Sequence, residues 1–162
     1  MTPTDELNIR VAREHFAAES AHDTERTLAT LADDIMYHVV AAAAIVRGKE
    51  AVSKYYDVWW TAFPDVDIKI QRLVAVGEWV IAENIATATH LGPWLGVPPT
   101  GKKTVQHLCA ICRIRDGLLI DTLPIEGCNA TGTMTMFERN IVGTISNNEI
   151  NGLFVRGARQ PR

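Results

Sequence analysis

The sequence has little net charge and no long apolar run. Its 162 residues include 16 Lys or Arg and 19 Asp or Glu, which gives a formal charge of -3. Lys49, Lys54, Lys102 and Lys103 are scattered or paired, without the basic stripe interleaved with aromatic residues that nucleic-acid binding needs. The N-terminal segment has no apolar secretory core, and no run of residues approaches membrane-spanning length. We therefore expect no nucleic-acid partner, no membrane partner and a cytoplasmic location.

Cysteine is scarce as well. Cys109, Cys112 and Cys128 cannot all pair within the chain, and without an export segment they are expected to be reduced thiols. Cys109 and Cys112 have CxxC spacing, but residues three apart on a strand point to opposite faces, and no second CxxC completes a set of four ligands. The sequence therefore predicts small buried side chains here, with neither a metal site nor a redox site.

The segment GVPPTGKK, residues 96–103, lacks what the phosphate-binding pattern GxxxxGK[ST] requires. Lys103 stands where the metal-binding hydroxyl should be, and Pro98 and Pro99 have no backbone NH to offer a phosphate. A strand is also expected after the segment, where phosphate binding needs a helix. We expect no nucleotide cofactor, and we interpret the segment as a rim or lid over a cavity.

Helical spacing of apolar residues dominates the N-terminal third of the chain. It predicts a helix over 5–20, capped by Thr4, and a short second helix capped by Asp23 that ends at a pair of acidic residues. A β-branched and aromatic strand over 35–40 follows, and then a third helix with one apolar face over 49–63.

From residue 66 onward the apolar period changes to two, which is typical of strands. Turns are indicated at Gly77-Glu78 and at Asp116-Gly117, so four further strands form two antiparallel hairpins. Helices followed by an antiparallel sheet indicate the α+β class, in which a curved sheet can wrap against the helices and enclose a pocket. The predicted strands cover residues 66–76, 79–90, 104–115 and 118–125.

The chain is long enough for one compact core, and we expect that core within residues 1–138. Residues 139–162 form a polar C-terminal extension with a few apolar positions. Two alternatives stand for this extension: a frayed tail, or a segment that docks on a partner subunit.

A series of short motifs runs through the chain in a fixed order: ADDIMYH, GKEAV, AFPD, TH-G-WLG-PPTGK and RIRDGLLID. In this combination the chain resembles the SnoaL-like polyketide cyclases, over about residues 5 to 138. The resemblance implies the nuclear transport factor two superfold, a conical α+β barrel, and an aspartate and a histidine as acid/base residues. In this chain it points to Asp121 and His107 for these catalytic roles.

Asp121 lies in an otherwise apolar strand between Ile120 and Leu123. If it faces the cavity, poor solvation would make it hold its proton more tightly than an exposed aspartate does. Such a carboxyl group can take a proton from carbon beside a carbonyl and return it, as an aldol closure or an isomerisation requires. The alternative is a solvated Asp121 on the outer face of its strand.

The spacing within the last hairpin complicates a joint role for the two residues. Strand positions whose numbers sum to about 233 should pair, so His107 lies near Glu126 and about 16 Å from Asp121. The odd offset of five residues places His107 and Asp121 on opposite faces, unless a bulge, for which Pro124 is a plausible site, turns both inward. With such a bulge they would hold opposite ends of a substrate, with Glu126 beside His107.

Further side chains are candidates for substrate binding. His90 closes its strand at the mouth of the loop, and either Tyr37 or His38 should face the pocket because the two alternate. A phenol in an apolar pocket would be a useful neutral donor to an enolate oxygen. Apolar surface for a planar ligand would come from five more residues, although core packing is the stronger reading of the two phenylalanines. These five are Phe16, Met36, Trp59, Phe63 and Trp94.

The leading hypothesis is a cofactor-independent acid/base enzyme, a cyclase or isomerase acting on a hydrophobic carbonyl compound such as a polyketide. A dehydratase or epoxide hydrolase on the same scaffold is the second reading, in which Arg113 and Asp121 would supply part of an Asp-Arg-Asp set. A non-catalytic binding or dimerisation module is the third. In all three cases an uncovered apolar sheet face predicts a homodimer or a higher homo-oligomer.

Overall fold

The computed structural model describes residues 1–39 and 44–126. The described residues do not include 127–138, the C-terminal end of the predicted domain, where Cys128 stands. They do not include the predicted extension over 139–162 either. None of the helices in the described ranges is long and apolar enough to cross a bilayer.

Three helices form one layer of the molecule: α1 (Pro3–Ser20), α2 (Thr24–Ala29) and α3 (Lys49–Ala62). Asp23 caps α2 by accepting a hydrogen bond from Arg26 N, as expected. The cap of α1 is Thr2, and the expectation of Thr4 is wrong. Pro3 fits the first helical position because it needs no NH partner there, and Thr2 and Asp5 exchange reciprocal backbone-to-side-chain hydrogen bonds of 2.8 and 3.2 Å.

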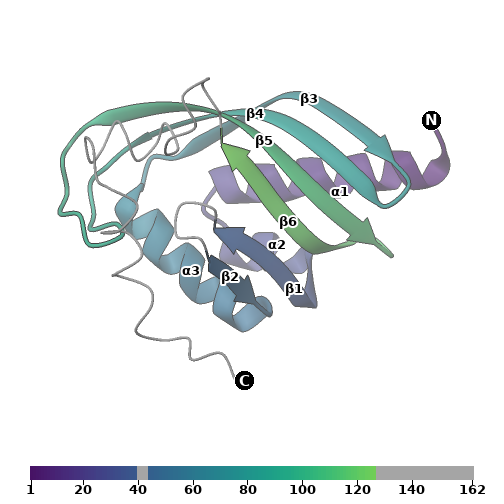
Figure 1. The fold of residues 1–162 in the computed structure, drawn as a ribbon, viewed down its shortest axis with the longest axis horizontal. Helices are drawn as coiled ribbons and strands as arrows, with labels where there is room; N and C mark the ends of the chain where they lie inside the picture. The colour runs from purple at the N-terminus through teal and green to yellow at the C-terminus, as the bar shows by residue number, and fades with distance from the viewer. Residues whose placement is uncertain (40–43, 127–162) are drawn as a thin grey trace.

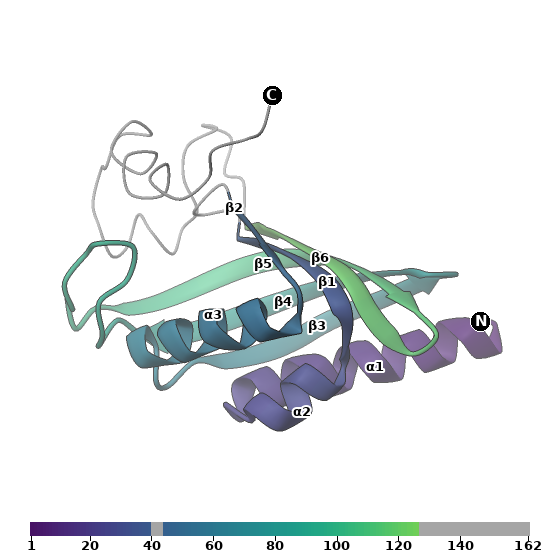
Figure 2. The same cartoon turned by 90° about the horizontal axis from the view of Figure 1, so that it is seen from below.

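The second layer is a single six-stranded sheet, curved over the helices, so the α+β prediction is confirmed (Figures 1 and 2). Its order is β2-β1-β6-β5-β4-β3, and all neighbours are antiparallel except β1 and β6, which are parallel. The short strand β2 was not predicted from the sequence. The strands are β1 (Leu31–Val39), β2 (Ala44–Arg47), β3 (Asp67–Val76), β4 (Trp79–Thr89), β5 (Lys103–Arg115) and β6 (Leu118–Glu126).

All three helices lie on one face of the sheet, which we call the concave face (Figure 2). On β4 and β5 the even-numbered residues point to this face and are almost all buried, whereas the odd-numbered residues point to the opposite, convex face. Several concave positions are alanines, which leaves room for large side chains from the helices. The alanines are Ala82, Ala86, Ala88 and Ala110, and the helices contribute Phe16, Tyr56 and Trp60 to the same core.

The loop between β4 and β5 is tied to the end of α3. Ala62 O accepts hydrogen bonds from the backbone NH groups of Leu91 and Gly92, at 2.9 and 3.1 Å. Asp65 accepts two more from Thr89, one from its NH and one from its hydroxyl, each 2.6 Å long. The AFPD motif therefore anchors the strand end that leads into the loop.

His90 connects the beginning of the same loop to its end through hydrogen bonds. Its backbone pairs with Lys102 O and Gly101 N at 3.0 and 2.9 Å, its Nδ1 lies 3.1 Å from Thr100 Oγ1, and its ring packs on Phe63. The His90 side chain is fully buried, so burial lowers the pKa of its imidazole, and a backbone hydrogen bond at Gly92 acts in the opposite direction. The TH and PPTGK motifs thus meet around a neutral, buried histidine.

We expect Gly92→Ala to lower the free energy of unfolding by about 1–3 kcal/mol or more, because a Cβ at this position would stand 2.3 Å from Thr61 O and 2.9 Å from the Ala62 Cα. Urea unfolding measures the change. Gly101→Ala is the control, since a Cβ there meets nothing within 4 Å and only its positive φ of 68° adds strain. Equal losses in the two variants would contradict this account of the close approach.

We also expect His90 to make stability depend on pH. A histidine whose folded pKa is lowered binds fewer protons in the folded state than in the unfolded chain, so its contribution is complete above the ordinary histidine pKa of about 6.5 and is lost as the pH falls below it. The free energy of unfolding of the wild type should therefore fall between pH 7.5 and 5.5 more steeply than that of His90→Gln. Identical slopes for the two proteins would show that His90 is not the titrating group.

Candidate functional site

Two amide side chains on the concave face have open hydrogen-bonding capacity. Asn84 on β4 is fully buried, and neither its Oδ1 nor its Nδ2 has a hydrogen-bond partner within residues 1–39 and 44–126. Gln106 on β5 is also buried, and its Nε2 has no partner in the same ranges. Asn84 pairs with Leu108 in the ladder and Gln106 with Ala86, so the two amides are diagonal neighbours on one face, roughly 7–8 Å apart. A buried polar group without a partner costs about 1–3 kcal/mol, so these two amides are candidates for polar contacts with a ligand.

Aromatic rings gather between α3 and the concave face. Tyr55 lies at the centre of this aromatic cluster, with ring centroids 5.3 Å from Tyr37, 6.5 Å from Trp59 and 6.1 Å from Trp94. Tyr56 stacks on Trp60 at 4.8 Å on the other side, and its ring lies 5.7 Å from that of Tyr37. Such a cluster provides flat apolar surface on the same side of the sheet as the two amides.

One carboxylate lies among these rings. Glu19, in the last turn of α1, is 3% exposed, and its Oε1 accepts hydrogen bonds from the hydroxyls of Tyr56 at 2.5 Å and Tyr37 at 3.5 Å. Burial raises the pKa of both phenols well above the ordinary value, and the negative charge of Glu19 raises it further. Both tyrosines therefore remain protonated and act as hydrogen-bond donors.

His15, one helical turn before Glu19, lies beside the same carboxylate oxygen, Oε1. Its Nε2 lies 3.4 Å from Glu19 Oε1, and its Nδ1 lies 2.8 Å from Thr30 Oγ1. Thr30 donates its own hydroxyl hydrogen to Thr27 O at 2.7 Å, so its oxygen is left to accept from His15 Nδ1. Helix α1 is thereby fixed to the start of β1.

Asp121 does not join this cluster. Tyr37 points toward the helices, so its neighbour His38 points to the convex face, and His38 Nε2 lies 3.1 Å from Asp121 Oδ1. The contact does not meet hydrogen-bond geometry, and no described residue donates a hydrogen bond to Asp121 Oδ1. Both side chains are 28% exposed. The expectation that Asp121 faces the interior of the cone is therefore wrong, and of Tyr37 and His38 it is Tyr37 that faces inward.

A bulge explains this placement. The first two pairs after the turn, Arg115 with Leu118 and Ile114 with Leu119, have the register expected from the sequence. The next residue of β5, Arg113, pairs with Asp121, so Ile120 is an extra residue on β6. The bulge therefore lies at Ile120 and not at Pro124, and it shifts the remaining pairs by one position.

After this shift His107 and Asp121 share a face, but it is the convex one. His107 is exposed and pairs with Ile85, six positions from Arg113, which puts it about 20 Å from Asp121 along the ladder. The residue opposite Asp121 is Arg113 rather than Cys112, and Glu126 pairs with Leu108 rather than with His107. The structure does not bring together the two residues predicted to be catalytic.

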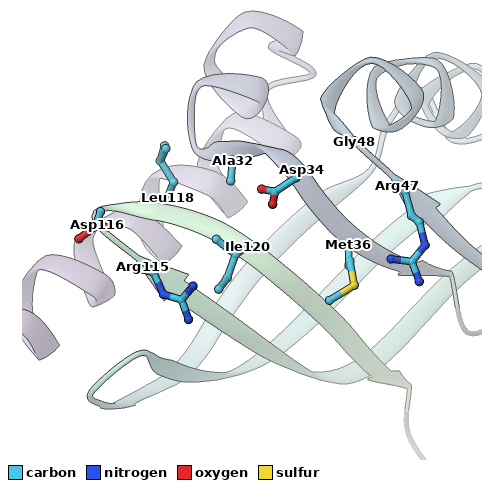
Figure 3. A pocket seen from close by; sticks show the side chains of 9 residues that line it. All are labelled: Ala32, Asp34, Met36, Arg47, Gly48, Arg115, Asp116, Leu118 and Ile120. Atoms are coloured by element: carbon cyan, nitrogen blue, oxygen red, sulfur yellow. The ribbon is translucent and has the colours of Figure 1, made fainter.

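The remaining predicted binding residues divide between several places. Trp59 and Trp94 belong to the aromatic cluster. Phe16 and Phe63 pack in the core, which was the alternative to ligand binding given for them from the sequence. His90 lies in the loop closure, and none of the described residues is a hydrogen-bond partner of its Nε2. Met36 faces the convex side, where it lines a groove of about 800 Å³ together with Ile120, Asp34 and Arg47. In Figure 3 the helices lie behind the strands that carry these side chains.

Sequence reasoning missed Asn84, Gln106 and Glu19. Asn84 is the one polar residue among the even positions of β4 between Val80 and Ala88, a pattern that could have revealed it. Glu19 follows His15 by four positions and so shares a helical face with it. Nothing in the sequence alone indicates that the two strands put their amides side by side.

The two described cysteines point to opposite faces, as their spacing predicts. Cys112 is buried on the concave face, where burial raises the pKa of its thiol to about 12, and Cys109 is half-buried on the convex face. Across residues 1–39 and 44–126, no group of three or more histidine, cysteine or acidic side chains could hold a metal ion.

Comparison with known proteins identifies the family of the chain and other proteins that share its fold. The family model of the SnoaL-like polyketide cyclases matches residues 9–122. Among solved structures, a candidate SnoaL-like polyketide cyclase of Jannaschia sp. CCS1 is similar with a TM-score of 0.75 and 19% identity, over 90% of this chain and 98% of that one. TsrD of Streptomyces laurentii has a TM-score of 0.71 and 19% identity, over 86% and 97% of the two chains.

An LEH-like epoxide hydrolase of M. tuberculosis also shares the fold, with a TM-score of 0.64 and 20% identity over 77% of this chain and 86% of that one. No curated protein matches the sequence. The solved structures show the fold, and the family model covers more than half of the chain. The chain therefore belongs to the SnoaL-like polyketide cyclase family.

Proposed function

We propose that the concave face is the active site of a cofactor-independent acid/base enzyme of the cyclase or isomerase type, acting on a hydrophobic carbonyl compound. The observation that carries this proposal is Asn84, a fully buried amide whose two polar atoms have no partner in the part of the chain that the structure describes. Selection rarely keeps such a group in a core unless it serves binding or catalysis.

The open polar atoms define what the ligand must offer. Asn84 presents one acceptor and one amide donor group, and Gln106 Nε2 adds a second donor. A ligand with a hydroxyl and a carbonyl close together satisfies this set, and its rings would lie against the aromatic cluster around Tyr55. Polyketide-like hydroxyketones combine these properties.

The tyrosines supply the electrostatic part of the chemistry. Loss of a proton beside a carbonyl produces an enolate, whose oxygen is stabilised by neutral donors already in place. Tyr37 is suited to this role because its bond to Glu19 is long, at 3.5 Å, whereas Tyr56 is held at 2.5 Å. We therefore assign enolate stabilisation to Tyr37.

A non-catalytic small-molecule binder is the second candidate function. It is favoured by the position of Asp121 and His107 on the convex face, where neither can reach a ligand on the concave face. The epoxide hydrolase reading has less support, because Arg113 Nε donates to Glu78 Oε2 at 2.8 Å and its guanidinium stacks on Trp79.

We further propose that the convex face of β3, β4 and β5 is covered by a second copy of the chain. Exposed apolar side chains follow one another across these strands, and such a patch is uncommon on a monomer. They are Val74, Val76, Trp79 and Ile81, and Val105 on β5 is exposed farther along the same face.

Asn84→Leu should raise stability and weaken ligand binding at the same time. Replacing an unpaired buried amide by an apolar group of similar size should raise the free energy of unfolding by about 1 kcal/mol or more. The Kd for 1,8-dihydroxyanthraquinone, a planar hydroxyketone, should rise about tenfold, or about 1.4 kcal/mol. Urea unfolding and quenching of tryptophan fluorescence measure the two effects.

Asn8→Leu is the matched control. Asn8 is also buried, but its Nδ2 donates to Gly77 O at 2.8 Å, so its replacement should lower stability by about 1 kcal/mol and leave probe affinity unchanged. Loss of stability in Asn84→Leu together with unchanged probe affinity would mean that Asn84 is an ordinary core residue, and the proposed site would be wrong.

A further inference from the structure

We propose that Glu19 on α1 is the residue that accepts the substrate proton, an inference that rests on the function proposed above. An acid/base enzyme with its site on the concave face needs a proton acceptor there. Among the described residues, Glu19 is the only carboxylate that lies within the aromatic cluster. The last hairpin, which the sequence favoured, offers no substitute, because Asp121 faces the other side of the sheet.

The polar contacts of the Glu19 carboxylate with described residues are made by one of its oxygens, Oε1. Oε1 receives the hydroxyls of Tyr56 and Tyr37 and lies next to His15 Nε2. Within residues 1–39 and 44–126, no hydrogen bond reaches Oε2. The side chain is thus held firmly through Oε1 while Oε2 keeps its lone pairs for a proton, which is the arrangement that a fixed general base requires.

Glu19 also lies over the part of the sheet where a ligand would rest. Tyr37 pairs with Thr122, and Thr122 with Cys112, so these three residues form one row across the concave face. The Tyr37 hydroxyl lies 3.5 Å from Glu19 Oε1, so the carboxylate lies beside this row. Ala110 and Pro124, the next inward pair along β5 and β6, have no titratable group that could compete.

The proposed step is a simple proton transfer. The C–H bond beside the substrate carbonyl breaks, its proton passes to Glu19 Oε2, and its electron pair forms the carbon–carbon double bond of an enolate. The charge develops on the carbonyl oxygen, where the Tyr37 hydroxyl donates a hydrogen bond. Glu19 then returns the proton, to another carbon in an isomerisation or to the new alkoxide in an aldol closure, and becomes a carboxylate again.

Proton exchange tests this assignment without a cognate substrate. The full-length protein is incubated with 2-tetralone in D2O, and loss of the C1 proton signal is followed by NMR. We expect the wild type to accelerate exchange above the buffer rate, and Glu19→Gln to reduce the enzymatic rate about 100-fold or more. The affinity of Glu19→Gln for 1,8-dihydroxyanthraquinone should stay within about twofold of wild type, since the amide preserves size and still accepts from Tyr56.

Glu14→Gln is the matched control on the same helix. Glu14 is half exposed and pairs with Arg26, so its replacement should leave exchange unchanged. Glu19→Asp, which keeps the charge but withdraws it by one methylene, serves if Glu19→Gln does not fold, and it should lose at least about tenfold in rate.

The outcomes separate the two proposals. Exchange at the wild-type rate in folded Glu19→Gln or Glu19→Asp would overturn the role of Glu19 and leave the proposed enzyme function in place. Exchange lost in Asp121→Asn but retained in Glu19→Gln would move the base to the convex face. A wild-type protein that binds the anthraquinone but does not accelerate exchange would overturn both the enzyme function and the role of Glu19, and would favour the binding protein.

Discussion

The whole arrangement depends on one geometric constraint, the alternation of side chains along β4, β5 and β6. Each strand residue faces either the helices or the opposite side, and hydrogen-bonded neighbours share a face. A single extra residue at Ile120 shifts the β5–β6 register and sets the direction of every later residue on β6. Asp121 and His38 consequently meet on the convex face, and the interior keeps Thr122 and Pro124 from that strand.

The concave face is polar where a core optimised for stability would be apolar. Asn84 and Gln106 have unpaired atoms among alanines, and Glu19 is a buried carboxylate held by two phenols. Buried polar groups of this kind reduce stability, and proteins retain them mainly where function requires them. The aromatic rings of the same core supply flat apolar surface of the kind that a planar ligand contacts.

The family motifs have a structural role that differs from their expected chemistry. Asp65 of AFPD binds Thr89, His90 of the TH pair binds Thr100 of PPTGK, and Gly92 permits the loop to approach Ala62. Together they close the β4–β5 loop against the end of α3. Motifs that identify a family can therefore describe how its fold is closed, while the chemistry of one member depends on residues outside those motifs.

The sequence by itself determined the class of the fold, the order of its helices and most of its strands, and the membership of a family. These follow from local periodicity, turn residues and motifs, each of which acts over a few neighbouring residues. Only the tertiary structure decided which face each strand residue occupies. A bulge of one residue reverses that face, and contacts such as Tyr56 with Glu19, which lie 37 positions apart, form only when α1 and α3 pack on the same side of the sheet. For this reason the sequence left open whether Tyr37 or His38 faces the helices, and it could not show that Asp121 lies on the opposite face.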